Sequence, residues 1–170
     1  MYTLLQAMER LENKVLRMNS DPSIPLDQVL HSYLAGLEML FPGMHCAIHR
    51  IRNWRLADGL APSLPAAYLD TIAGLVIGRN EGSCGAAAAT RERVIVDDIS
   101  THPNWVKYNQ LAEKYLLRAC WSNPILNSSG ETMAVLAMYY YEPRKPTEME
   151  MKIMDKSTAF LQDILLKHPE

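Results

Sequence analysis

The chain has 170 residues, of which 48% are hydrophobic and 21% are charged, and its formal net charge is −2. This composition is typical of one globular domain, and without a basic stripe it argues against nucleic acid or a membrane as the main partner. The three cysteines, Cys46, Cys84 and Cys120, show no C-x-x-C spacing. Their odd number indicates a reducing compartment, and hence a cytoplasmic protein without a disulfide framework.

The first 18 residues predict an amphipathic helix, and the charges within it exclude a signal peptide or a membrane span. Its apolar residues recur at steps of three and four, as at the a and d positions of a coiled coil: Met1, Leu4, Met8, Leu11, Val15 and Met18. We interpret this stripe as a homodimer seam, and residues 1–20 as a coiled-coil-like helix before a domain at 21–170. The alternative is a helix whose apolar face packs on its own domain.

The rest of the chain predicts helices and strands in mixed order. Helices are expected at 26–40, 66–73, 84–90, within 103–116 and from 147 onward, where Thr147 and Glu150 fit a capping box. Strands are expected at 44–51, 54–60, 94–96, 118–126 and 132–141. Because two pairs of strands have the pattern of hairpins, we expect an antiparallel sheet and an α+β fold class.

The loop from Gly78 to Gly85 lacks the G-x-G-x-x-G spacing, and no Lys-Ser/Thr follows it. It is therefore neither a dinucleotide fingerprint nor a phosphate-binding loop. Ser83 is a natural N-cap for the helix at 84–90. Cys84 then lies in the first turn, where the helix dipole favours a thiolate. Cys84 is either a redox-sensitive thiol or a small buried residue that fills space under the sheet.

The sequence shows no metal or catalytic constellation, so we expect no enzymatic activity and no metal. His45 and His49 lie on one strand at a separation of roughly 13 Å, too far apart to share a metal, and are expected to be half exposed. The second half of the chain is rich in aromatic residues, which either line a pocket for a small planar ligand or belong to the core: Trp105, Tyr108, Tyr115, Trp121, Tyr139, Tyr140 and Tyr141.

Several short motifs follow one another between residues 26 and 165: Pro42-Gly-Met-His-Cys-Ala-Ile, Gly82-Ser-Cys-Gly85, Val94-Ile-Val-Asp-Asp-Ile99, Pro103-Asn-Trp105 and Leu117-Arg-Ala-Cys-Trp-Ser122. In this order they resemble the GAF domains of bacterial signalling proteins, especially those beside GGDEF, EAL or histidine-kinase domains. The resemblance implies a central antiparallel sheet with terminal helices packed on one face and often paired between protomers. The other face would hold a ligand pocket under loops and short helices.

The resemblance also implies which residues surround the pocket or its lid: Cys84, Asp98, Trp105, Tyr108, Arg118, Cys120 and Ser122. Trp121 is a further candidate, because the strand register decides whether Arg118, Cys120 and Ser122 or the residues between them face inward. We expect the pocket over the strand at 118–125, roofed by 103–116. Arg118 would hold an anionic edge of the ligand, unless it pairs with Asp97 or Asp98.

Neither the cyclic-nucleotide motif nor the Cys-His pair that anchors bilins is recognisable, so the ligand or cofactor stays unidentified. We expect a sensory domain that binds a small molecule or senses redox state. Its terminal helices would signal to an output domain, such as a diguanylate cyclase, phosphodiesterase or histidine kinase, in the same full-length chain. The alternatives are a degenerate dimerisation scaffold and a free methionine sulfoxide reductase, in which Cys84 matches one of several required cysteines.

Overall fold

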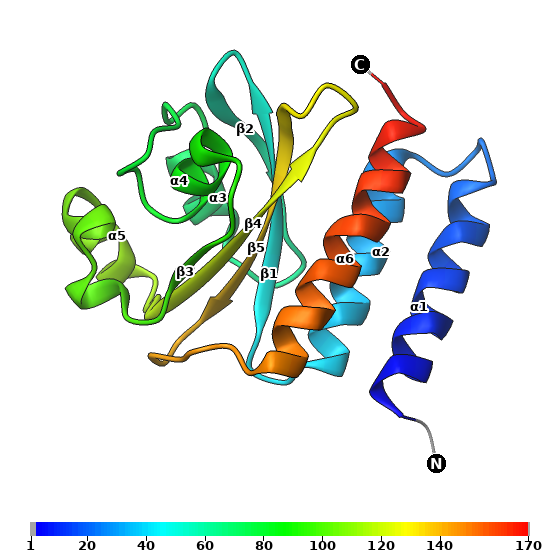
Figure 1. Cartoon of the computed structure of the whole chain (residues 1–170), viewed down its shortest axis with the longest axis horizontal. Helices are drawn as coiled ribbons and strands as arrows, with labels where there is room; N and C mark the ends of the chain where they lie inside the picture. The colour runs from blue at the N-terminus through cyan, green and yellow to red at the C-terminus, as the bar shows by residue number, and fades with distance from the viewer. Residues whose placement is uncertain (1–2, 170) are drawn as a thin grey trace.

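The computed structural model describes residues 3–169, which form a five-stranded sheet between two layers of helices (Figure 1). The strand order is β2-β1-β5-β4-β3, and every neighbouring pair is antiparallel. The strands are β1 (His45–Arg52), β2 (Arg55–Leu60), β3 (Val94–Val96), β4 (Ala119–Leu126) and β5 (Thr132–Tyr140). The predicted α+β class and antiparallel sheet are thus confirmed.

The terminal helices α1 (Leu4–Asn19), α2 (Leu26–Leu40) and α6 (Glu148–Leu166) cover one face of the sheet (Figure 1). Helices α2 and α6 lie directly on the strands, and α1 packs outside them against α2. As predicted, α6 begins at the capping box of Thr147 and Glu150. None of the helices within residues 3–169 combines the length and the apolar character that a bilayer crossing requires.

The opposite face carries shorter elements, which the sequence placed within a few residues except for η1, which was not predicted. They are α3 (Ala66–Ile72), α4 (Cys84–Thr90), the 3₁₀ helices η1 (Ile99–Thr101) and η2 (Pro103–Tyr108), and α5 (Asn109–Lys114). The segment expected to be partly helical at 103–116 therefore consists of η2 and α5. These elements stand over the strands on the side away from the terminal helices (Figure 1).

The apolar stripe of α1 is buried within the chain itself. Met8 and Val15 are 0% and 1% exposed, and Leu4, Leu11 and Met18 pack against the same core. Met1 lies outside the described residues. Gly36 of α2 permits this close packing, because a Cβ there would lie 2.3 Å from Leu11 Cδ1. The structure corrects the interpretation of this face as a dimer seam and agrees with the alternative of packing on its own domain.

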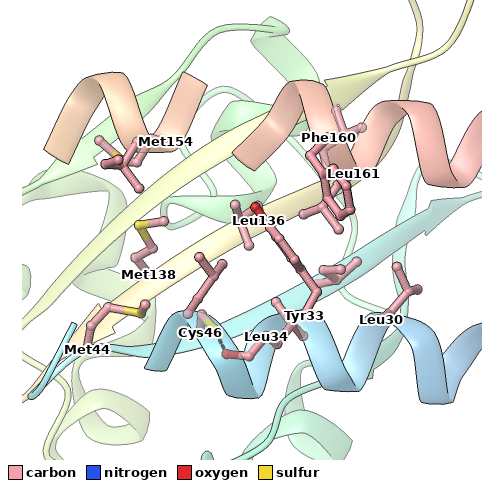
Figure 2. Close-up of a cluster of buried hydrophobic side chains, with 14 of the residues drawn as sticks. Leu30, Tyr33, Leu34, Met44, Cys46, Leu136, Met138, Met154, Phe160 and Leu161 are labelled. Carbon is pink, nitrogen blue, oxygen red and sulfur yellow. Dashed lines mark hydrogen bonds between the residues drawn. The ribbon is translucent and has the colours of Figure 1, made fainter. Parts of the chain in front are cut away.

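The core between the sheet and the terminal helices is formed by large apolar side chains (Figure 2). Tyr33 of α2 stacks on Phe160 of α6 with ring centroids 4.7 Å apart. Met138 of β5 lies near Met154 of α6 and Met44 in Figure 2. The burial of these groups provides much of the driving force for folding. The terminal helices and the sheet therefore share one continuous core.

Candidate functional site

A small cavity lies between the sheet and the short helices of the second face. Its volume is about 40 Å³. Its walls are mostly apolar or aromatic and come from β2, α3, the loop before α4, η2, α5 and β5: Leu56, Tyr68, Ile72, Leu75, Val76, Trp105, Tyr108, Leu111 and Tyr139. Glu81, Ser83 and Cys84 add polar groups to this lining. An apolar cavity with a few polar side chains is typical of a small-molecule site.

The roof of the cavity, η2, is held to the loop before α4 by hydrogen bonds. Trp105 Nε1 donates to Ser83 Oγ at 2.9 Å, and Gly82 N donates to Asn104 O at 2.9 Å. Gly82 has a φ of +63°, a conformation that favours glycine. Ser83 occupies the predicted N-cap position, but its side chain does not cap α4. The Ser83 hydroxyl instead accepts the hydrogen bond from the Trp105 indole. The prediction that the Ser83 side chain caps the helix was therefore wrong.

Glu81 brings a negative charge to the mouth of the cavity. Lys107 Nζ and Tyr108 Oη both donate hydrogen bonds to its carboxylate. The bond from Lys107, followed by that from Tyr108, lowers the pKa of Glu81. Burial, and then the bond to Glu81, raises the pKa of Tyr108 to about 12. At neutral pH the mouth therefore presents the Glu81–Lys107 ion pair beside a neutral phenol, so the Lys107 charge is already paired and does not favour an anionic ligand.

The floor of the cavity leads into a buried network of polar side chains. His49 Nε2 lies 3.0 Å from Tyr139 Oη, and Tyr68 Oη donates to Tyr139 Oη at 3.1 Å. Cys84 Sγ lies 3.7 Å from Tyr139 Oη. His49 is 1% exposed, so its predicted half exposure was wrong. The network satisfies polar groups that would otherwise be costly to bury.

Two thiols complete this network on the side of β4. Cys84 Sγ lies 3.2 Å from Ser122 Oγ, and Cys120 Sγ lies 3.5 Å from the same oxygen. A hydrogen bond from Cys120, aided by the nearby His49, lowers the pKa of the Cys84 thiol although burial opposes this shift. Burial raises the pKa of the Cys120 thiol. Cys84 is thus both a buried residue and the more acidic of the two thiols.

The structure brings five of the eight candidate site residues together. Cys84, Trp105 and Tyr108 line the cavity, and Cys120 and Ser122 lie directly behind Cys84. Cys120 and Ser122 lie on the cavity-facing side of β4. This is one of the two alternatives that the alternation of side chains along a strand allowed. Residues of the segment predicted as the roof, 103–116, do line the cavity. The floor, however, comes from Tyr139 of β5 and Leu56 of β2 in place of β4.

Trp121, the candidate that depended on the strand register, faces away from the cavity, so its inclusion among the site residues was wrong. Side chains alternate along β4, so Trp121 faces the terminal helices. Its ring lies 4.5 Å from that of Tyr140, and its Nε1 donates to Arg144 O at 2.9 Å. Its role is therefore in the core beneath α6, on the face opposite the cavity.

Asp98 and Arg118 lie outside the cavity lining and pair with each other. Arg118 Nη2 is 3.6 Å from Asp98 Oδ1, where the chain enters β4. Asp98 also caps η1 through Ser100 N at 3.0 Å. Arg118 borders a separate surface cleft of about 260 Å³ between η1 and α5. The structural alternative for Arg118 is confirmed, and the expectation that it holds an anionic ligand edge loses its geometric basis.

Sequence reasoning missed several residues of the site. Tyr68 and Glu81 reach the cavity from α3 and from the loop, and no motif marked them. His49 could have been found only from the register of the strands. It pairs with Val135, which belongs with Ala137 to the core on the cavity side of the sheet. Among residues 3–169, His, Cys, Asp and Glu side chains form no group of three that could hold a metal.

A wider hollow of about 680 Å³ lies at another edge of the sheet, between the start of α2, β1, β5 and the end of α6. Arg50 Nη2 and Asp27 Oδ1 pair across it at 2.6 Å. In this pair the Asp27 side chain keeps 64% of its surface accessible, and the Arg50 side chain keeps 17%. The small cavity is the better candidate because buried polar side chains converge on it.

The model of the family described as "GAF domain" matches residues 25–163. A methyl sulfide methyltransferase-associated sensor of Methanosarcina acetivorans is 36% identical over 160 residues. That match covers 92% of this chain but only 16% of the relative, so the chain spans a small part of that protein.

Solved structures with the same fold include proteins of different kinds. The GAF domain of a phosphoenolpyruvate-protein phosphotransferase from Coxiella burnetii superposes with a TM-score of 0.73 at 17% identity, covering 96% of this chain and 95% of that one. Free methionine-R-sulfoxide reductase of Neisseria meningitidis, in complex with its substrate, gives 0.72 at 21% identity, with 95% and 88% coverage. Likeness at such identities shows the fold alone.

Proposed function

The chain belongs to the GAF domain family, and from that premise we propose that it is a sensory domain whose ligand binds in the cavity between the sheet and η2. The observation that carries the proposal is the convergence of Cys84, Ser83 and Glu81 on an otherwise apolar cavity. The name of the Methanosarcina relative, a sensor, agrees with this role.

The lining favours a small ligand without negative charge. Glu81 lies at the mouth, and its neighbouring cation, Lys107, is already bound to it. The volume of about 40 Å³ is far below the roughly 300 Å³ or more of a typical drug-sized site. The ligand therefore consists of a few atoms, or a larger ligand displaces η2. A methyl sulfide is small, uncharged and apolar, and the relative's name makes it a reasonable first probe.

We propose that the signal crosses the sheet to α6. Tyr139 faces the cavity, whereas its neighbours Met138 and Tyr140 belong to the core under the terminal helices. Two hydrogen bonds connect β4 to α6: Asn123 Nδ2 to Met154 Sδ at 3.4 Å, and Gln162 Nε2 to Leu126 O at 2.8 Å. A shift of β4 or β5 would therefore be felt by α6.

The proposed recipient is an output domain in the same full-length protein, such as a diguanylate cyclase, a phosphodiesterase or a histidine kinase. The far greater length of the relative supports a multidomain context. A homodimer through α1 also remains a prediction. It would use Leu5 and Leu16, which are 53% and 37% exposed and lie on one face because 11 residues span about three helical turns. Sedimentation of Leu5→Lys with Leu16→Lys tests it, since an unchanged dimer would exclude this face.

The proposed binding site can be tested with a matched pair of variants. Val76 is 48% exposed at the cavity rim, and Val106 is 65% exposed on η2 outside the lining. Native mass spectrometry of freshly purified protein reports co-purified ligand, and the same measurement follows added methyl sulfide. Val76→Trp should reduce ligand occupancy, whereas Val106→Trp should leave it unchanged. Equal occupancy in both variants would place the ligand elsewhere, and a lack of any ligand would favour a dimerisation scaffold.

We further propose that the domain catalyses no reaction. Free methionine-R-sulfoxide reductases share the fold, yet the sequence has no cysteine between Cys46 and Cys84 or between Cys84 and Cys120. The additional cysteines that this chemistry uses, upstream of the glycine loop and in the loop after it, therefore find no match. Turnover of free methionine sulfoxide with a thiol reductant tests this proposal, and measurable turnover that Cys84→Ser abolishes would overturn it.

A further inference from the structure

The buried thiols of Cys84 and Cys120 come from elements far apart in the sequence and meet behind the cavity. Cys84 is the first residue of α4, and Cys120 lies on β4, which packs under α4. Both sulfurs contact the same atom, Ser122 Oγ, at 3.2 and 3.5 Å, so the two thiols lie on either side of one hydroxyl. The third cysteine, Cys46, lies on the other side of the sheet, with its Sγ 3.4 Å from Leu34 O (Figure 2).

The two thiols differ in their access to the cavity. Cys84 forms part of the lining, whereas Cys120 is 0% exposed and lies behind it. The cavity volume of about 40 Å³ exceeds the roughly 10–15 Å³ that a water-sized molecule needs. A molecule little larger than water, such as hydrogen peroxide, therefore fits against the Cys84 sulfur but reaches Cys120 only through Cys84.

The surroundings also divide the chemical roles. His49 and Tyr139 stand on the Cys84 side of the network, and each can stabilise charge that develops at its sulfur. The lowered pKa of the Cys84 thiol increases the fraction present as thiolate, the form that attacks an oxidant. Cys120, with its raised pKa, stays protonated until an electrophilic sulfur forms beside it.

We propose that Cys84 and Cys120 form a reversible dithiol–disulfide site, in which Cys84 reacts with a peroxide and Cys120 resolves the product. The Cys84 thiolate attacks one peroxide oxygen, the O–O bond breaks, and the departing hydroxide takes up a proton and leaves as water. Cys84 is then a sulfenic acid. The Cys120 sulfur attacks the Cys84 sulfur, the S–O bond breaks, and hydroxide leaves with the Cys120 proton as a second water. Overall, each domain oxidises its two thiols once and reduces one hydrogen peroxide to two waters, a stoichiometric reaction and not a catalytic turnover.

The disulfide would tie the first turn of α4 to β4 and remove the Cys84 thiol from the cavity wall. The chemistry of the pair does not depend on the proposed ligand, whereas its use as a signal rests on the proposed sensory function. If the pair forms a disulfide but no ligand binds, the cavity senses oxidants by itself. If ligand binds but no disulfide forms, the present inference fails and the proposed function stands.

The test uses the whole chain, reduced and then treated with hydrogen peroxide, after which the free thiols are blocked by N-ethylmaleimide in urea, because all three cysteines are buried in the folded protein. Trypsin separates the three cysteines into peptides 18–50, 80–91 and 119–144. We expect mass spectrometry to show 80–91 joined to 119–144, lighter by two hydrogen atoms than the sum of the two, and Cys46 still alkylated. Dithiothreitol should restore both thiols. A wild-type protein in which Cys84 accumulates sulfenic or sulfinic acid without the cross-link would overturn the proposal.

Three serine variants assign the roles. Cys120→Ser should leave a sulfenic acid on Cys84, which dimedone traps when it is added together with a denaturant. Cys84→Ser should protect Cys120 from oxidation, because the peroxide then meets no thiolate in the cavity. Cys46→Ser is the matched control, and its cross-link should form as in the wild type. Oxidation of Cys120 in folded Cys84→Ser at the wild-type rate, with folding checked by circular dichroism, would show that Cys84 is not the entry point.

Discussion

Trp105 donates its indole hydrogen to the hydroxyl of Ser83 at 2.9 Å, and this bond joins the cavity roof to the start of α4. The two residues are 22 positions apart, and both are buried. A buried bond between a roof and a wall means that opening the cavity breaks a specific contact. If the cavity binds the ligand of the proposed sensory function, the hydrogen bond from Trp105 to Ser83 links the stability of the domain to the access of that ligand.

Removing the Ser83 hydroxyl should destabilise the domain. In Ser83→Ala the buried indole N–H has lost its acceptor, which costs about 1–3 kcal/mol. Urea unfolding followed by circular dichroism measures the free energy of unfolding. In Trp105→Phe, the further change Ser83→Ala should cost much less, because the shared bond is already absent. Equal costs of Ser83→Ala in both backgrounds would show that the bond contributes little.

Met8 should contribute to the stability of the single domain. It is 0% exposed in the core beneath α1, so Met8→Ala should lower the free energy of unfolding by about 2–5 kcal/mol. The control, Lys14→Ala, alters an exposed position of the same helix outside the proposed dimer face. Urea unfolding at two protein concentrations distinguishes the roles of the apolar stripe. An effect of Met8→Ala that appears only at the higher protein concentration would restore the dimer seam, because association would then be its source.

Arg118 should be dispensable for ligand binding. Its guanidinium pairs with Asp98 and borders the separate cleft between η1 and α5. Once a ligand is found, Arg118→Ala should bind it with wild-type affinity in a titration, whereas Val76→Trp should not. The unfolding midpoint should change little, because partly exposed ion pairs contribute weakly. Weaker binding in folded Arg118→Ala would return this residue to the site.

Glu81 should make stability depend on acid pH. Its pKa in the folded protein is lowered from the ordinary 4.5, first by the hydrogen bond from Lys107. The stabilisation is therefore complete above that ordinary value and is lost as the pH falls through the lower folded value. Relative to Glu81→Gln, the wild type should have a larger stability advantage at pH 7 than at pH 3, measured by urea unfolding.

The control for this measurement is Glu113→Gln, which changes an exposed carboxylate on α5. The stability of this variant relative to the wild type should show a weaker dependence on pH. An equal pH dependence for Glu81→Gln and Glu113→Gln would mean that the contacts of Glu81 with Lys107 and Tyr108 do not persist in solution.

The sequence by itself determined the strands and the α-helices of this protein and their order, but not the short 3₁₀ helix η1. Local signals suffice for this, because periodicity, caps and turn residues act over a few positions. The stripe of α1, the capping box at Thr147 and the hairpin before Thr132 are all local, and each element formed where it was expected. The sequence pattern also left open two possibilities for β4, and one of them was that Cys120 and Ser122 face the cavity side, as they do.

Only the tertiary structure decided what each face meets. The stripe of α1 has the same spacing whether it packs on α2 or on a second chain, and the close approach at Gly36 settles it. Trp121 and Cys120 are neighbours in sequence but lie on opposite faces, because the pairing of β4 with β5 fixes the register. The meeting of Cys84 with Cys120 depends on how α4 packs over the sheet, a long-range arrangement that no local pattern encodes.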